Sequence, residues 1–179
     1  ELPTELAEAK QWQQRRAKVL AETVRLKKGS DNVVAELQDS FSRDGLQIAY
    51  WRIKIGDQWT VPVTDISPPG ADSTTIVISD QGRKNCGEII GRLIDEGKRV
   101  VAVDPFFFGE AMVSQKDFLF AFMIATVGDR PLGVQADQVA AVARWLRASN
   151  ADQSVTLLAD GPRTSIIALI AAAIEEKAI

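Results

Sequence analysis

The sequence contains no histidine among its 179 residues. A Ser-His-Asp triad uses an imidazole as its general base, so no such triad can be completed from these residues alone. The single cysteine, Cys86, excludes an intrachain disulfide and leaves the redox compartment undecided. Since a nucleophilic cysteine would also need a histidine base, we interpret Cys86 as a small buried apolar residue at the start of a helix.

Neither sign of charge dominates, because 21 Lys and Arg residues oppose 24 Asp and Glu residues and leave a net charge of −3. No nucleic-acid partner is therefore predicted. No run approaches the roughly 18 apolar residues of a membrane span, so none is predicted. The length suits one domain with a sizeable core. The chain begins at Glu1, which indicates a processed or recombinant piece, and a signal peptide before Glu1 would imply a secreted or periplasmic protein.

The N-terminal residues 1–42 are predicted to form a helical lead-in. A partial apolar stripe predicts a helix over residues 4–28, with Thr4 as its N-cap and Gly29 as its stop. Residues 33–41 are expected to add a short helix or a turn.

A change of period then predicts a β-hairpin. Residues 46–55 alternate in the manner of a strand, and the Gly56-Asp57 turn leads into a second strand at 59–63. Pro62 cannot donate a ladder hydrogen bond, which confines this second strand to an edge or a bulge.

The rest of the chain alternates between apolar strands and helices. Continuously apolar strands separated by helices predict a parallel sheet covered on both faces. The predicted fold class is α/β, with an N-terminal helix and a β-hairpin leading into a mostly parallel sheet with helices on both faces. The strands are expected at residues 74–79, 99–103 and 154–159, and the helices at 86–96, 134–148 and 164–177.

The most informative segment joins the last strand to the last helix. It consists of Asp160, Gly161, Pro162 and Arg163. A strand, a sharp glycine-containing turn and a helix are the parts that present the serine of a G-x-S-x-G nucleophile elbow. This turn has the layout of such an elbow but no obvious nucleophile.

Two further segments strengthen the comparison. Residues 128–139 open with Gly-Asp-Arg-Pro-Leu-Gly, and 141–146 continue a helix to a Trp-Leu pair, while 101–110 place Asp-Pro-Phe-Phe-Phe-Gly-Glu after a strand. In this order the segments resemble the acetyl xylan esterase-like branch of the α/β-hydrolase superfamily over residues 44–179. The resemblance implies the N-terminal half of that fold, so that residues 43–179 form a partial domain, incomplete without further polypeptide.

The resemblance also implies where a nucleophile should lie. Matching the helix at Leu169 places the family's serine at Pro162, and a shift of one residue places it at Arg163. Neither side chain can attack a carbonyl, and a proline would hold φ near −65° where the hydrolase nucleophile is strained. We therefore expect a degenerate elbow. Ser165 is the remaining candidate nucleophile, and its alternative role is to satisfy backbone groups in the first helical turn.

The loop at residues 79–85 occupies the place of the family's oxyanion-binding turn. Gly82 could aim backbone amides into the crevice, next to Gln81, but the carboxylate of Asp80 would repel a developing oxyanion. The alternative is a helix-entry loop with polar capping residues.

Three carboxylates follow the carboxyl ends of predicted strands, the usual ligand position of open α/β sheets. They belong to Asp80, Asp104 and Asp160. Without a second ligand type we predict no metal site and no cofactor, and salt bridges to Arg83 or Arg163 are favoured.

The aromatic triplet at 106–108 cannot face one side only. Phe106 and Phe107 are therefore candidates for an apolar crevice wall that contacts an acyl or sugar group. The alternative is packing of the triplet under a lid segment at residues 118–123.

Two functions remain open from the sequence. One is a carboxylic ester hydrolase acting on acylated carbohydrate, with catalytic residues supplied by sequence outside this chain. The other is a non-catalytic binding or structural module, which the altered elbow favours, since the fold alone argues for neither. A strand at 154–159 left as an exposed edge would be an aggregation hazard. We therefore expect a partner that completes the sheet, either the remaining part of the same polypeptide or a second chain.

Overall fold

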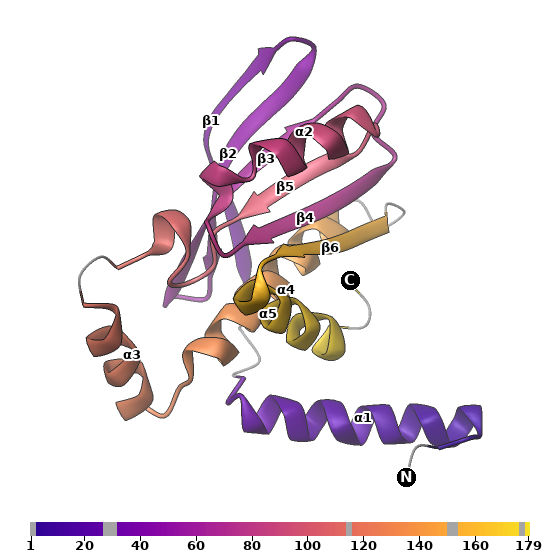
Figure 1. The fold of residues 1–179 in the computed structure, drawn as a ribbon, viewed down its shortest axis with the longest axis vertical. Coiled ribbons are helices and arrows are strands. Elements are labelled where there is room, and N and C mark those ends of the chain that lie inside the picture. The colour runs from indigo at the N-terminus through magenta and orange to yellow at the C-terminus, as the bar shows by residue number, and fades with distance from the viewer. Residues whose placement is uncertain (1–2, 27–31, 114–115, 150–153, 176–177) are drawn as a thin grey trace.

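The computed structural model describes residues 3–26, 32–113, 116–149, 154–175 and 178–179 as a six-stranded mixed sheet with helices on both faces (Figure 1). The strands are β1 (Val33–Arg43), β2 (Leu46–Ile55), β3 (Trp59–Ser67), β4 (Ser73–Ser79), β5 (Arg99–Val103) and β6 (Ser154–Asp160). The helices are α1 (Leu6–Thr23), α2 (Gly87–Asp95), α3 (Asp117–Thr126), α4 (Pro131–Ser149) and α5 (Pro162–Ile174), with short 3₁₀ turns η1 (Arg83–Asn85) and η2 (Gly109–Ala111).

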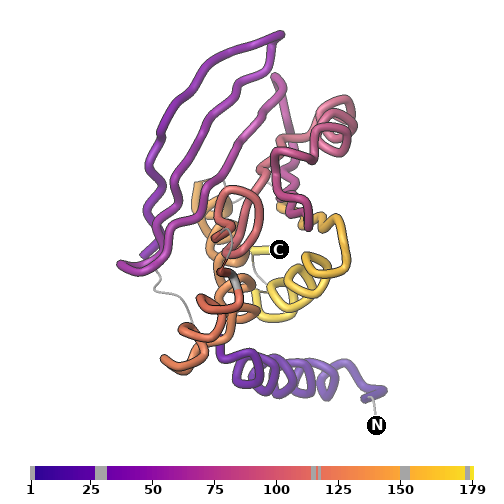
Figure 2. The backbone as a smooth tube through the Cα atoms, turned by 60° about the vertical axis from the view of Figure 1, so that its left-hand side comes forward, coloured from indigo at the N-terminus to yellow at the C-terminus, as the bar shows by residue number. Residues whose placement is uncertain are grey.

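The α/β fold class is confirmed, but the sheet is less parallel than predicted. The strand order is β1-β2-β3-β5-β4-β6. The pairings of β1 with β2, β2 with β3 and β3 with β5 are antiparallel. Among the described strands only the β5–β4 and β4–β6 pairings are parallel. The antiparallel strands extend beyond the helical layers, as the violet tube in Figure 2 shows.

The prediction of a short helix or turn at residues 33–41 is wrong, because this segment pairs with β2 as β1. The two strands meet at Asp44 and Gly45, whose φ angles are 52° and 81°. Two successive positive φ angles form the tight hairpin turn that matches strand twist. The helical lead-in is thus limited to α1, whose N-cap is Glu5 and not Thr4, while Gly29 lies outside the described residues.

Pro62 was expected at an edge or a bulge, but β3 lies inside the sheet between β2 and β5. Pro62 pairs with Arg52 of β2, and its carbonyl accepts the N–H of Asp104 at 3.3 Å. In a strand the N and O of one residue face the same neighbour. The missing N–H therefore points past the end of β5, and neither neighbouring ladder loses a hydrogen bond.

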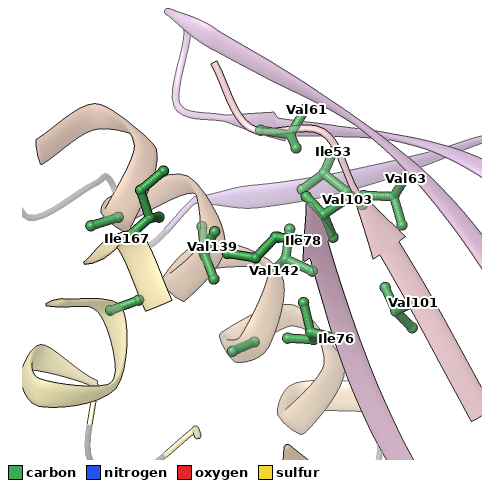
Figure 3. Packing of buried hydrophobic residues seen from close by; sticks show 14 of the residues in the cluster. Ile53, Val61, Val63, Ile76, Ile78, Val101, Val103, Val139, Val142 and Ile167 are labelled. Atoms are coloured by element: carbon green, nitrogen blue, oxygen red, sulfur yellow. The ribbon is translucent and has the colours of Figure 1, made fainter. Parts of the chain in front are cut away.

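The core lies mainly between the sheet and the helices α4 and α5 (Figure 3). Val139, Val142 and Ile167 pack there against Ile76 and Val103. Both faces are covered, as predicted, because α2 packs on the opposite face. Within the described part of the chain no helix is long and apolar enough to cross a membrane.

The expectation for Cys86 is confirmed. It is 1% exposed, stands at the N-cap of α2 and contacts the smaller core cluster with Val77 and Leu93. Burial raises the pKa of its thiol, so the group is neutral and poorly suited to nucleophilic attack.

Helix α4 approaches the end of α1 at a glycine, and this contact supports a stability prediction. A Cβ on Gly133 would lie 2.2 Å from the Val24 carbonyl oxygen. We expect Gly133→Ala to lower the free energy of unfolding by about 1–3 kcal/mol, since the two backbones must separate. The matched control is Gly91→Ala, where a Cβ in helix α2 meets nothing within 4 Å.

Gly91→Ala should raise the free energy of unfolding by up to about 1 kcal/mol, because alanine costs less backbone entropy in a helix. Urea denaturation followed by circular dichroism measures both variants. Equal effects of the two substitutions would show that the Val24 backbone does not lie against Gly133.

Candidate functional site

The turn between β6 and α5 has its unusual backbone at Gly161. Its φ of 114° and ψ of 158° belong to a region that glycine alone adopts readily. Pro162 is the first residue of α5, where a proline fits a helix. The strained apex therefore falls one residue before Pro162, and both positions matched to a serine, Pro162 and Arg163, lie in the first turn of the helix.

The space beside Gly161 is filled by the carboxylate of Asp80, which follows β4. This carboxylate accepts the backbone N–H of Thr164 at 2.8 Å, the Thr164 hydroxyl at 2.9 Å and the N–H of Arg163 at 3.2 Å. A Cβ on Gly161 would lie 2.4 Å from the Asp80 Cγ. Residue 161 therefore has no room for a side chain while Asp80 holds this position.

Asp80 behaves as a bound anion at the N-terminus of α5. Burial acts to raise its pKa, but the hydrogen bonds from Thr164 and Arg163 outweigh burial and hold the pKa of this carboxyl below its ordinary value. The group is thus negatively charged at neutral pH, and an oxyanion placed against the same N–H groups would meet its charge.

The loop after β4 uses its own amides internally. The N–H of Asp80 donates to the Asp160 carbonyl at 2.9 Å, that of Gln81 to the Ser79 hydroxyl at 3.1 Å, and that of Gly82 to the Ser79 carbonyl at 3.0 Å. A Cβ on Gly82 would also meet the Cα of Gly109 at 2.5 Å, so Gly82 is required for close backbone packing. These contacts favour the helix-entry alternative for this loop.

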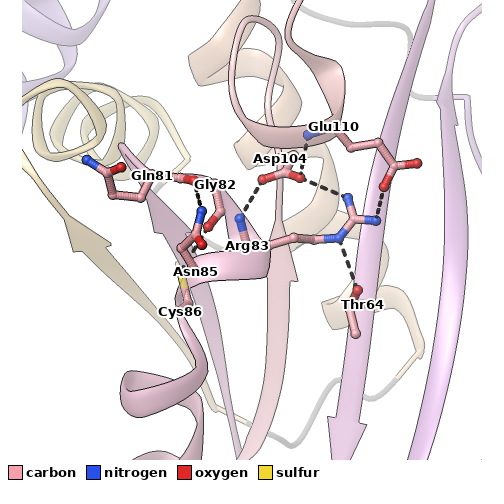
Figure 4. A network of polar contacts seen from close by, with 8 residues as sticks. All are labelled: Thr64, Gln81, Gly82, Arg83, Asn85, Cys86, Asp104 and Glu110. Atoms are coloured by element: carbon pink, nitrogen blue, oxygen red, sulfur yellow. Dashed lines mark hydrogen bonds and ion pairs between the residues drawn. The ribbon is translucent and has the colours of Figure 1, made fainter.

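A second polar network surrounds Asp104 at the end of β5 (Figure 4). The side chain of Asp104 is fully buried and accepts the N–H of Arg83 at 2.7 Å, its Nη1 at 3.1 Å and the N–H of Glu110 at 2.9 Å. The same guanidinium donates to Glu110 Oε2 at 2.6 Å and to Thr64 Oγ1 at 3.0 Å. The predicted ion pair to Arg83 is confirmed. Glu110 closes the Asp-Pro-Phe-Phe-Phe-Gly-Glu segment noted in the sequence, whereas Thr64 carried no sequence signal.

The three predicted carboxylates are satisfied separately. Asp80 binds the N-terminus of α5, Asp104 binds Arg83, and Asp160 accepts the Ser79 hydroxyl at 2.9 Å. The described residues hold no cluster of three or more His, Cys, Asp or Glu side chains that suits a metal ion.

Ser165 lies within the first turn of α5. Its hydroxyl donates to the Gly161 carbonyl at 2.7 Å, which also accepts the Ser165 N–H at 3.0 Å. A serine bonded to the carbonyl four residues earlier is a common arrangement inside helices. The Ser165 hydroxyl therefore forms a hydrogen bond with the helix backbone, as its alternative role predicts, but with a carbonyl and not with the expected N–H groups.

The aromatic triplet lies after β5 and contacts residues of α5 and β3. Phe108 is buried beneath the Arg163 guanidinium, which lies 4.5 Å from its ring centre. Phe107, also buried, stacks on Phe106 at 3.9 Å, and Phe106 contacts Trp59 of β3 at 5.1 Å. The segment predicted as a lid forms α3. An apolar wall for a ligand stays a prediction for Phe106 and Phe107.

No family model matches the sequence, and no curated protein matches it. Solved structures share its fold. A protein from Bacteroides fragilis NCTC 9343 assigned as an acetyl xylan esterase has a TM-score of 0.71 and 14% identity, over 92% of this chain and 50% of the other. Acetyl xylan esterase 1 from Thermoanaerobacterium sp. JW/SL YS485 has a TM-score of 0.62 and 14% identity, over 92% and 55%.

A cold-adapted esterase from an Arctic intertidal metagenomic library has a TM-score of 0.60 and 17% identity, over 78% of this chain and 61% of the other. The chain thus shares its fold with these solved esterase structures. The chain spans about half the length of the two acetyl xylan esterase structures.

Removal of the Asp80 carboxylate tests its role at α5. At pH 7 we expect Asp80→Ala to lower the free energy of unfolding by about 1–2 kcal/mol, as the loss of a helix cap does. Because the folded-state pKa is lowered, this contribution is complete above the unfolded pKa of about 3.9 and disappears as the pH falls through the folded value.

Urea denaturation of both proteins at pH 7 and pH 3 measures this change. The control is Asp72→Ala, at an exposed aspartate, which should change stability little at either pH. A loss for Asp80→Ala that is the same at both pH values would contradict the role of the charged carboxylate.

Proposed function

We propose that this chain is an esterase-like α/β-hydrolase domain that lacks a catalytic serine and acts as a non-catalytic binding or structural module. The single observation that carries the proposal is the elbow apex, where Gly161 lies against the Asp80 carboxylate. A working elbow presents a nucleophile at the turn and a backbone N–H for the oxyanion. Here the apex has no side chain, and the N–H groups of Arg163 and Thr164 bind an internal anion.

The remaining chemistry of the chain supports the same proposal. The 179 residues include no histidine that could serve as a general base. Ser165, the nearest hydroxyl on the helix apart from Thr164, donates its proton to a backbone carbonyl. The Ser165 hydroxyl has no base among its hydrogen-bond partners. The Thr164 hydroxyl donates to the Asp80 carboxylate, which also accepts two N–H groups; these lower its pKa and make it a weak base.

The alternative function is a carboxylic ester hydrolase acting on acylated carbohydrate, with catalytic residues outside this chain. The names of two solved structures that share the fold, both acetyl xylan esterases, support this alternative. It would require a nucleophile that reaches the crevice from another segment, beside the negative charge of Asp80.

A fluorophosphonate probe and 4-nitrophenyl acetate test the proposal on the purified chain. We expect no labelled serine and no turnover above the buffer rate, because the site has neither an activated nucleophile nor a free oxyanion site. Labelling or turnover that is lost in Ser165→Ala and kept in the control Ser149→Ala would overturn the non-catalytic assignment.

The outer edge of β6 supports the proposal that a partner completes the sheet. In the described part of the chain β6 pairs only with β4, and an open hollow of about 400 Å³ lies beside it. Leu169 of α5 lines this hollow and is 72% exposed. We propose that a further β-strand pairs with β6 and covers this hollow, because a strand satisfies the free backbone groups of the edge. The strand belongs either to the same polypeptide or to a second chain.

Light scattering on the 179-residue chain alone tests this proposed edge. Without its partner strand the chain should self-associate and give a mass above 19.5 kDa. Thr156→Lys places a charge on the exposed edge and should lower the mass towards that of the monomer. Met112→Lys, at a residue exposed elsewhere, should leave it unchanged. A monodisperse monomer of the unsubstituted chain would contradict the proposal.

A further inference from the structure

A groove of about 590 Å³ lies over the antiparallel strands, and none of the elbow residues line it. Its volume falls within the range of small-molecule sites. The strands β1, β2 and β3 supply one side, and the loops at η1 and η2 supply the other. The groove is lined by Gln38, Tyr50, Trp51, Arg52, Thr60, Pro62, Val63, Arg83, Lys84, Glu110 and Ala111.

The backbone of β1 is irregular at this groove. Leu37 pairs with Trp51 and Asp39 pairs with Tyr50, so Gln38 between them has no partner residue in β2. Such a β-bulge redirects a side chain and occurs often beside functional sites. The bulge places Gln38 among the groove residues.

The charges of the groove favour an anionic ligand. Arg83 is held by Asp104 and Glu110, but Arg52 and Lys84 form no ion pair with any described residue. The groove therefore holds two cations without an ion pair among the described residues, because Glu36, which lies opposite Arg52 in β1, pairs with Lys54. A guanidinium and an ammonium together suit a carboxylate, which an arginine binds through two parallel hydrogen bonds.

The other groove residues suit a sugar ring. Tyr50 is 38% exposed and offers a flat aromatic face. The Thr60 hydroxyl and the Gln38 amide oxygen offer polar groups for hydroxyls, while the Gln38 amide nitrogen donates to the Glu36 carbonyl at 3.2 Å. We infer that this groove binds an acidic saccharide, a pyranose ring that carries a carboxylate, with Arg52 and Lys84 on the carboxylate and Tyr50 against the ring. The inference rests on the proposed function only in treating the chain as a binding module, because it requires no ester hydrolysis.

Titration of the isotope-labelled chain with D-glucuronate, followed by NMR, tests the inference. D-glucose differs by the absence of the carboxylate and should bind at least about tenfold more weakly, as expected for the loss of a charge-assisted contact. Arg52→Gln and Lys84→Gln should each weaken glucuronate binding by about tenfold. Lys98→Gln is the control, since Lys98 pairs with Glu96 at 2.6 Å and does not line the groove.

A parallel titration with inorganic phosphate separates a sugar site from a general anion site. Phosphate binding as tight as that of glucuronate, together with no effect of Tyr50→Ala on glucuronate, would overturn the saccharide assignment. Glucuronate binding that Arg52→Gln leaves unchanged, or no saturable binding, would overturn the site itself. These results are measured without ester turnover, so they are independent of the outcome of the fluorophosphonate experiment.

Discussion

The contact between the Asp80 carboxylate and the first N–H groups of α5 is the interaction on which the β6–α5 turn depends. A helix N-terminus has only a few backbone donors without partners. Asp80 engages those of Arg163 and Thr164, and its side chain occupies the space next to Gly161. One carboxylate thus joins β4 to the β6–α5 turn, fills the space beside residue 161 and binds the first free N–H groups of α5.

The parallel half of the sheet could be predicted from the sequence because β4 and β5 are buried on both faces and read as continuous apolar runs. Strand β1 could not be recognised by its pattern. Most of its residues are exposed, so its apolar and polar residues do not alternate as they do in a half-buried strand. The signal that marked it was Asp44-Gly45, a pair typical of two-residue hairpin turns. Pro62 can lie in an interior strand because β5 ends beside it, at Val103. The end of β5 relative to β3 is set by the strand pairing in the folded chain and could not be predicted from the sequence.

The sequence placed Asp80 and Asp104 correctly at the carboxyl ends of their strands, because that follows from strand order. Their partners were harder to foresee. Glu110 lies in a segment that was singled out in the sequence, but its contact with Arg83 was not foreseen, and nothing local marks Thr64. The sequence match put the apex of the turn at Pro162, one residue after its position in the structure. The match aligned residues along the helix and took no account of backbone angles, whereas the φ of Gly161 defines the apex.

The close approach of Gly161 and Asp80 also limits how this sequence can evolve. A serine at position 161 would clash with Asp80, while replacing Asp80 first would leave the start of α5 uncapped. Each step alone costs stability, and the φ of 114° would strain a serine at position 161 even after Asp80 is replaced. Two positions 81 residues apart thus constrain each other, and the backbone angle adds to the retention of the glycine over generations of single substitutions.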